Sequence, residues 1–259
     1  MDLDIAGRRA IVCASSRGLG RACADSLARE GAHLWINARE PEPLEAAAAE
    51  LRDRHGVEVT AVTGDIGDEA TRAELLERCP EPDILVNNNG GPDPGRFQDW
   101  DRDAWIAALD ANMLAPVLMI RAVVDGMVER RFGRIVNITS AMVKTPMSAM
   151  GLSTGARTGL TSMSKALSRD VAAANVTVNN LLPERFDTDR QRQMAELHAA
   201  LGDISVAEAY DRMRDTIAAK RLGRPEEFGD TCAFLCSAQA GYLSGQNLQL
   251  DGGSYTGLL

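Results

Sequence analysis

The sequence predicts an α/β fold, a single doubly wound Rossmann domain with a seven-stranded parallel sheet. Short β-branched or apolar runs alternate with longer helical patterns along nearly all 259 residues. This alternation is typical of parallel βαβ units. No linker, internal repeat or low-complexity tract interrupts it. A doubly wound sheet often reaches this length as one unit, so we expect residues 1–259 to form one domain.

Seven runs are predicted as buried strands because each is short and rich in β-branched or apolar residues. They are residues 8–13, 32–37, 58–63, 83–87, 134–139, 176–181 and 247–250. The longer periodic segments are predicted as helices, at residues 20–30, 43–54, 71–78, 102–130, 154–174 and 225–237.

Residues 185–224 depart from this alternation, since they contain helical pieces and no strand. In open α/β sheets the ligand crevice lies beyond the carboxyl ends of the strands. An insertion after the sixth strand overhangs that crevice, so we expect these residues to form a helical substrate lid. The alternative is a surface excursion without a function.

Composition and charge exclude several classes of partner. A net charge of −9 argues against nucleic acid and anionic membranes, which select for basic surfaces. The first residues are polar and no run approaches about 18 apolar residues, so we expect a cytoplasmic protein without membrane contact. The five cysteines are scattered and form no CxxC pair, which indicates reduced thiols and no metal site.

A glycine-containing loop follows the first predicted strand and opens a helix, at residues 14–20. Glycines there let the backbone approach a pyrophosphate, which binds the N–H groups at the helix start. The second predicted strand ends in Asn37, Ala38 and Arg39, with no acid to repel a 2′-phosphate. Arg17 and Arg39 fit recognition of that phosphate, so we expect NADP as the cofactor. The alternative is a pair of surface arginines in an arginine-rich chain.

Pro116 interrupts the long helix predicted at residues 102–130. Proline has no N–H, so the carbonyl of Asn112 loses its partner in the helix. A freed buried carbonyl is expected to hold a water molecule. The alternative is that Pro116 only bends the helix.

Three motifs together resemble the short-chain dehydrogenase/reductase family over about residues 3–255. The glycine motif is matched at Gly18 and Gly20, with Ala14 in place of a glycine; strain is expected if that position needs a positive φ. The NNAG motif is matched at Asn87, Asn88 and Gly90, with Asn89 in the alanine position. Residues 221–227 and the Asp-Gly-Gly at 251–253 resemble the family's C-terminal signature.

The resemblance implies which residues bind the cofactor. Asp65 and Ile66 are expected beside the adenine and Thr188 beside the carboxamide, while Glu184 stands where the family has a glycine. The full expected set is Ser16, Arg17, Gly18, Leu19, Gly20, Asn37, Arg39, Asp65, Ile66, Asn87, Asn89, Gly90, Arg157, Pro183 and Thr188. The family also implies a homotetramer or homodimer.

The family's reaction uses an Asn, a Ser, a Tyr and a Lys. Asn112 and Ser140 match the first two. The usual intervals place Ser153 at the tyrosine and Arg157 at the lysine, and no shift of register restores them. Tyr210, Tyr242 and Tyr255 all lie far downstream, and Lys165 lies three turns late on its helix. A divergent, 3-oxoacyl-[acyl-carrier-protein] reductase-like branch of the family shares this loss.

Lys144 is the candidate for the missing acid. It follows Ser140 by four residues, in the loop expected to line the substrate pocket. A lysine there can donate a proton, polarise a carbonyl or form a Schiff base. We therefore expect an NADP(H)-dependent oxidoreductase that reduces a small-molecule carbonyl substrate, with Ser140, Lys144, Asn112, Ser153 and Arg157 as the catalytic set. A non-redox lyase or isomerase using Lys144 and a catalytically silent NADP(H)-binding protein stay open, as does a solvated role for Lys144.

Overall fold

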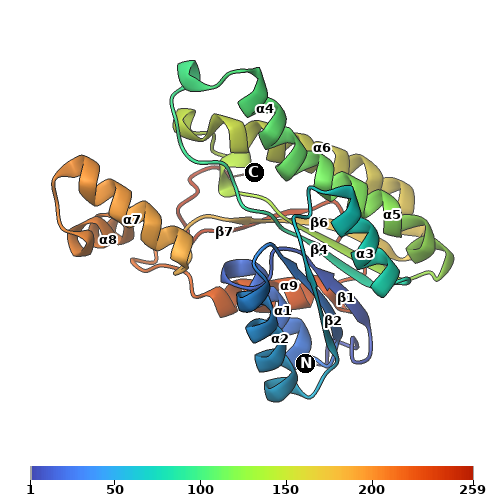
Figure 1. The fold of residues 1–259 in the computed structure, drawn as a ribbon. Coiled ribbons are helices and arrows are strands. Elements are labelled where there is room, and N and C mark those ends of the chain that lie inside the picture. The colour runs from blue at the N-terminus through green and yellow to red at the C-terminus, as the bar shows by residue number, and fades with distance from the viewer. Residues whose placement is uncertain (1, 259) are drawn as a thin grey trace.

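The computed structural model describes residues 2–258 and confirms the doubly wound fold (Figure 1). Seven parallel strands pair in the order β3-β2-β1-β4-β5-β6-β7. Their bounds are β1 Arg9–Val12, β2 His33–Ala38, β3 Val59–Thr63, β4 Ile84–Asn87, β5 Gly133–Ile138, β6 Val176–Pro183 and β7 Asn247–Leu250. The strand order reverses direction between β1 and β4. In such sheets, ligands bind at the carboxyl ends of the strands beside this reversal.

Helices cover both faces of the sheet. One face packs against α1 (Gly18–Arg29), α2 (Pro41–His55) and α9 (Pro225–Cys236), and the other against α3 (Glu69–Arg78), α5 (Ala115–Glu129) and α6 (Gly151–Val171). Each face has its own cluster of buried apolar side chains. The two layers of helices therefore hold the strand ends, and the loops that follow them, at one rim.

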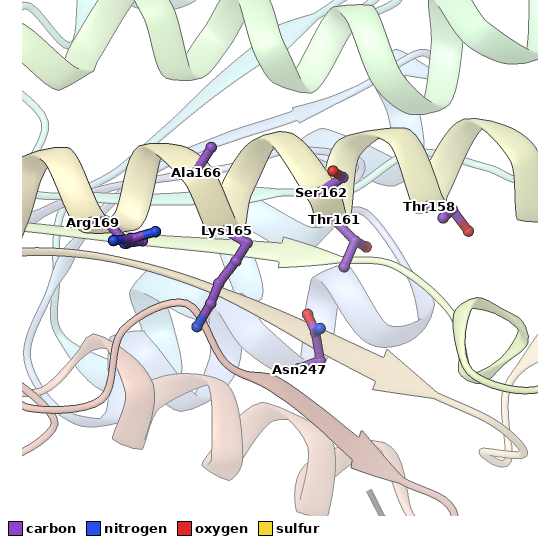
Figure 2. Close-up of a pocket in the computed structure, with 7 residues that line it drawn as sticks. All are labelled: Thr158, Thr161, Ser162, Lys165, Ala166, Arg169 and Asn247. Carbon is purple, nitrogen blue, oxygen red and sulfur yellow. The ribbon is translucent and has the colours of Figure 1, made fainter.

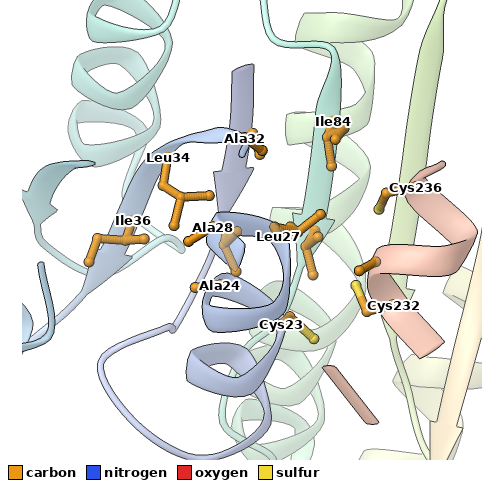
Figure 3. Close-up of a cluster of buried hydrophobic side chains, with 14 of the residues drawn as sticks. Cys23, Ala24, Leu27, Ala28, Ala32, Leu34, Ile36, Ile84, Cys232 and Cys236 are labelled. Carbon is orange, nitrogen blue, oxygen red and sulfur yellow. The ribbon is translucent and has the colours of Figure 1, made fainter. Parts of the chain in front are cut away.

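The cluster under α1 and α9 contains three of the cysteines, Cys23, Cys232 and Cys236 (Figure 3). All five cysteines are free thiols and buried, which confirms the prediction of reduced thiols in the core. The two helices approach closely at Gly229, where an added Cβ would lie 2.3 Å from the Ala22 carbonyl oxygen. This contact fixes the helix that begins at the glycine loop.

The predicted lid forms two helices, α7 (Asp189–Gly202) and α8 (Val206–Asp215). They project from the sheet at the left of Figure 1. A small core of their own joins them, made of Ala195, Ala199, Ala209 and Met213. Helical structure without a strand is confirmed here, and the role as a lid stays a prediction.

The helix predicted at residues 102–130 is present without a break over Arg102–Glu129, but it contains a π-helical turn that was not predicted. The segment is divided into α4 (Arg102–Leu109), a π-helical turn (Asp110–Leu114) and α5. In this turn the Ala115 N–H donates to the Asp110 carbonyl, one residue further back than in an α-helix. Pro116 then lies in the first turn of α5, where its missing N–H costs little.

The segment Arg102–Glu129 is long and apolar enough to pass as a membrane span, with a mean hydropathy of 1.6. In the fold, however, α5 buries Met119, Val123 and Met127 in the cluster on the second face of the sheet. The core helix of an α/β sheet has the same composition, so hydropathy alone does not distinguish the two.

A ladder of asparagines crosses four neighbouring strands at one register. Asn87 Nδ2 donates to Asn137 Oδ1 (2.9 Å), and Asn137 Nδ2 donates to Asn180 Oδ1 (3.1 Å). Asn180 Nδ2 in turn donates to Asn247 Oδ1 (2.8 Å). Asn137 also donates to Ser164 Oγ of α6 (2.9 Å). The ladder therefore ties α6 to the strands whose ends build the site.

We expect Asn137→Ala to lower the free energy of unfolding by about 3 kcal/mol, because the buried amides of Asn87 and Asn180 lose a partner. Asn247→Ala at the partly exposed end of the ladder is the matched control and should cost about 1 kcal/mol. Urea unfolding measures both values. Equal costs would contradict the ladder as a source of stability.

Candidate active site

The glycine loop between β1 and α1 has the geometry of an anion cradle. Ala14 and Gly18 adopt positive φ angles of 46° and 61°. A Cβ added at Gly20 would lie 2.3 Å from the Ala14 carbonyl oxygen and 2.7 Å from Asn88 Nδ2, so this position requires glycine. Asn88 Nδ2 donates to that same carbonyl (3.1 Å). The strain expected at Ala14 is therefore present, and Asn88 holds the loop.

The rim of this loop carries the predicted phosphate-binding cations. Arg17 and Arg39 are both exposed, with Ser16 and Leu19 partly buried beside them. Arg17 Nη2 donates to Glu40 Oε1 at 2.8 Å. Sequence reasoning missed Glu40, a carboxylate next to Arg39 that competes with a phosphate for the Arg17 guanidinium.

Two residues that are predicted to bind the cofactor, Asn37 and Asn87, use their side chains in hydrogen bonds within the protein. Asn37 is buried, and its amide donates to the carbonyls of Val62 (3.0 Å) and Gly64 (3.1 Å). Asn87 belongs to the ladder described above. Their side chains therefore hold the strand ends together.

The remaining predicted contacts line the same rim. Asp65 Oδ1 accepts from the Gly67 N–H (2.8 Å), and Ile66 is buried in the cluster of the second face. Thr188 caps the N-terminus of α7 and shares a hollow of about 410 Å³ with Gly18. The fold thus brings the glycine loop and the start of α7 together, as the resemblance implies.

Arg157 forms the centre of the opposite half of the site. Its guanidinium is buried and donates four hydrogen bonds, to Ser153 Oγ (3.1 Å) and the carbonyls of Ile138 (2.7 Å), Thr139 (3.0 Å) and Asn89 (3.2 Å). Among residues 2–258 no carboxylate lies within ion-pair distance of it. Burial lowers the pKa of Arg157 to about 10. It therefore stays a cation at neutral pH and is already engaged by the protein.

Ser153 is positioned by this contact. Its Oγ accepts from Arg157 Nε, which leaves its own O–H to donate to another group. A Cβ added at the nearby Gly91 would lie 3.7 Å from this Oγ, so the loop after β4 passes beside it.

Helix α6, which carries Ser153 and Arg157, is held by a row of glycines. Cβ atoms added at these glycines would lie within 3.0 Å of side chains just before α4, on α4 and in the π turn; the pairs are Gly151 with Trp100, Gly155 with Trp105 and Gly159 with Met113. The close approach that glycine allows thus sets the position of the site helix.

Asn112 lies in the π turn, and its buried Oδ1 has no hydrogen-bond partner. The sequence analysis placed the freed acceptor at the Asn112 carbonyl. The unpartnered atom in the structure is instead the side-chain Oδ1 of Asn112. In the same turn, Asn89 Nδ2 donates to the Ala111 carbonyl (3.1 Å). Gly90 donates its N–H to Asn89 Oδ1 (2.8 Å), which orients this amide. An unpaired buried oxygen fits a water site at Asn112.

Ser140 and Lys144 frame a short 3₁₀ turn after β5. Ser140 Oγ accepts from the Met142 N–H (3.2 Å), and Lys144 follows at the end of the turn. The Lys144 side chain is half-buried, with its Nζ 5.4 Å from the centroid of the Tyr255 ring. Sequence reasoning set Tyr255 aside as too far downstream, but β7 returns it to the rim where β5 ends.

Glu184 occupies the position where the resemblance implies a glycine. It follows Pro183, the last residue of β6, and its Oε1 lies 3.8 Å from Arg185 Nε. Burial raises the pKa of Glu184, while Arg185 and a hydrogen bond with the Ser254 side chain act in the opposite direction. The site thus contains a half-buried carboxyl where the family has a glycine.

Lys165 lies outside this rim. It borders a hollow of about 470 Å³ between α6 and Asn247 of β7 (Figure 2). Its Nζ donates to the Gly245 carbonyl (3.1 Å). The prediction that Lys165 is a surface residue is confirmed. Separately, among residues 2–258 no group of three His, Cys, Asp or Glu side chains is suited to hold a metal.

A doubly wound sheet with a glycine loop after β1 and polar side chains after β4, β5 and β6 is the architecture of a dinucleotide-binding protein. A family model described as enoyl-(acyl carrier protein) reductase matches residues 13–255. The NADPH-dependent reductase BacG of Bacillus subtilis is 32% identical over 252 residues, which cover 95% of this chain and 97% of that protein. Human dehydrogenase/reductase SDR family member 4 is 31% identical over 255 residues, with 96% and 88% covered.

The crystal structure of L-sorbose reductase from Gluconobacter frateurii, complexed with NADPH and L-sorbose, is 28% identical with a TM-score of 0.95. The match covers 100% of both chains. The chain belongs to the short-chain dehydrogenase/reductase family.

Ala14→Gly should raise the free energy of unfolding by about 1 kcal/mol. A left-handed conformation costs a non-glycine residue about 1–2 kcal/mol, and the freer unfolded chain offsets part of the gain. Ala22→Gly, within α1, is the matched control and should lower stability by about 1 kcal/mol. Chemical denaturation of both variants tests this, and a loss of stability in Ala14→Gly would overturn it.

Proposed function

We propose that this protein reduces the carbonyl group of a small-molecule substrate with NADPH, using Lys144 as the proton donor. As a short-chain dehydrogenase/reductase it is an oxidoreductase, and its cofactor is NADP(H), as in BacG and L-sorbose reductase. The assignment of Lys144 as a non-standard proton donor goes beyond these comparisons and is our proposal. One observation carries it: Lys144 stands half-buried one short turn from Ser140, in a site whose lysine and tyrosine positions hold Arg157 and Ser153.

The residues around the glycine loop fit the cofactor. The cradle at Gly18 and Gly20 has no side chain where a pyrophosphate would approach, and β2 ends without an acid. Arg17 and Arg39 would hold the 2′-phosphate, and Thr188 would bind near the nicotinamide end. When bound, NADPH supplies a hydride to the substrate carbonyl carbon.

The other half of the site then serves the carbonyl oxygen. Ser140 and Ser153 would donate hydrogen bonds to this oxygen, and the fixed cation of Arg157 behind Ser153 stabilises negative charge that develops there. The four hydrogen bonds of Arg157 all go to groups of the protein, which fixes it as a cation, so we assign proton donation to the Lys144 ammonium. A water at Asn112 would return the proton to Lys144.

The substitution Lys144→Ala should lower the rate of carbonyl reduction by about 10²–10³-fold, the usual contribution of a general acid. The assay follows transfer of deuterium from 4-deuterated NADPH into product over a panel of carbonyl compounds. Lys165→Ala is the matched control, since it removes the same charge outside the site, and should retain the wild-type rate.

Three results would contradict this function. Deuterium transfer that survives in Lys144→Ala removes the role of Lys144. Turnover without deuterium transfer, with a borohydride-trapped adduct at Lys144, indicates a lyase or isomerase. Tight NADPH binding without turnover of any compound indicates a silent binding protein.

Preference for NADPH over NADH should depend on Arg17 and on Glu40. Arg17→Ala should lower the ratio of NADPH to NADH affinity about tenfold, because it removes a charge-assisted contact. Glu40→Gln should raise that ratio about threefold, because it frees Arg17 from the 2.8 Å ion pair. Fluorescence titration measures the affinities, with the exposed Arg96→Ala as control. An unchanged ratio in all variants would contradict the assignment.

We also infer a homotetramer or homodimer in the cytoplasm. Ile106, Leu114 and Leu118 are exposed along α4, the π turn and α5. Apolar side chains gathered in this way favour association between copies.

A further inference from the structure

The C-terminal turn brings an aromatic ring to Lys144. Residues 251–255 follow β7, and β7 pairs with β6 beside β5. Lys144 lies just after β5, and its Nζ is 5.4 Å from the centroid of the Tyr255 ring. This is within the range of a cation–π interaction, in which the face of the ring attracts the ammonium.

Asp251 fixes the position of Tyr255. Its carboxylate accepts from the backbone N–H groups of Gly253 (2.9 Å) and Tyr255 (2.8 Å), and from Gln249 Nε2 (3.0 Å). Ser254 Oγ donates to the Asp251 carbonyl (2.8 Å). The Tyr255 ring is therefore attached to a turn, residues 251–255, that its first residue, Asp251, holds closed.

The base of the lid holds the same turn from the other side. The Ala219 N–H donates to the Gly252 carbonyl (2.9 Å). A Cβ added at Gly252 would lie 2.7 Å from Ile217 Cγ2, and one added at Gly253 would lie 3.2 Å from Ala218 Cβ. Residues 217–219 thus pack closely on the turn that carries Tyr255.

We propose that Tyr255 is a positioning residue that holds the Lys144 ammonium beside Ser140 through the face of its ring. This inference rests on the proposed role of Lys144 as the proton donor. A lysine side chain has many rotamers and a strongly hydrated head group, so a fixed aromatic face restricts both. Productive placement of the ammonium then needs the ring and does not need the phenol hydroxyl.

The direction of the hydroxyl supports this assignment. A Cβ added at Gly257 would lie 2.3 Å from the Tyr255 hydroxyl oxygen, so the hydroxyl lies against the backbone of the next turn of chain. The Lys144 contact described above is with the ring. We therefore assign the contact with Lys144 to the ring, and we assign no proton-donor role to the phenol.

The test compares Tyr255→Leu with the conservative Tyr255→Phe. Tyr255→Leu should lower kcat about tenfold and leave the Kd for NADPH within twofold, because the glycine loop is untouched. Tyr255→Phe keeps an aromatic face and should retain kcat within about twofold. Tyr242→Leu, at a fully exposed tyrosine, should behave as wild type.

A double-mutant cycle separates this role from general damage to the fold. In a Lys144→Ala background, Tyr255→Leu should have no further effect on the residual rate. An equal loss of kcat with Tyr255→Phe, or the same tenfold loss in the Lys144→Ala background, would overturn the positioning role. A large effect of Lys144→Ala with none from Tyr255→Leu would overturn this inference alone and leave the proposed function standing.

Discussion

The site depends on one buried cation. Arg157 joins the end of β5, the loop after β4 and Ser153 on its own helix through four hydrogen bonds. A guanidinium without a carboxylate partner is costly to bury unless polar atoms surround it, so these carbonyls must stay in place for the fold to be stable. Arg157 thus has a structural role in this site, which is consistent with our proposal that Lys144 donates the proton.

Other contacts serve the same geometry at a distance. The asparagine ladder ties α6 to the strands through Ser164, and the glycine row lets α4 and the π turn approach that helix from the outside. Asn88 holds the glycine loop against the end of β4. In both halves of the site, these core contacts therefore fix the position of the backbone. The backbone in turn determines where the side chains of the site lie.

The periodic pattern of the sequence was sufficient to predict the strands, their parallel arrangement and the helical insertion before α9. The pattern did not predict the π turn. A single turn that is one residue wider leaves the apolar periodicity almost unchanged, although it changes the direction in which Asn112 points. Glu40 and Asn37 show the second limit. Both are polar residues at or just beyond the end of β2, where a cofactor could bind. Only the structure shows that Glu40 pairs with Arg17 and that the Asn37 amide donates to strand carbonyls. Tyr255 shows the third: separation along the chain says nothing about distance across parallel strands.

The packing of residues 217–219 on the Asp251 turn has a mechanical consequence. The helices α7 and α8 share a core of their own and would therefore move as one rigid arm, which residues 217–219 join to the rest of the chain. This segment and the aromatic ring share one small turn, so displacement of the arm transmits strain to the ring. Under the proposed roles of the lid and of Lys144, substrate entry and the placement of the ammonium would then be coupled.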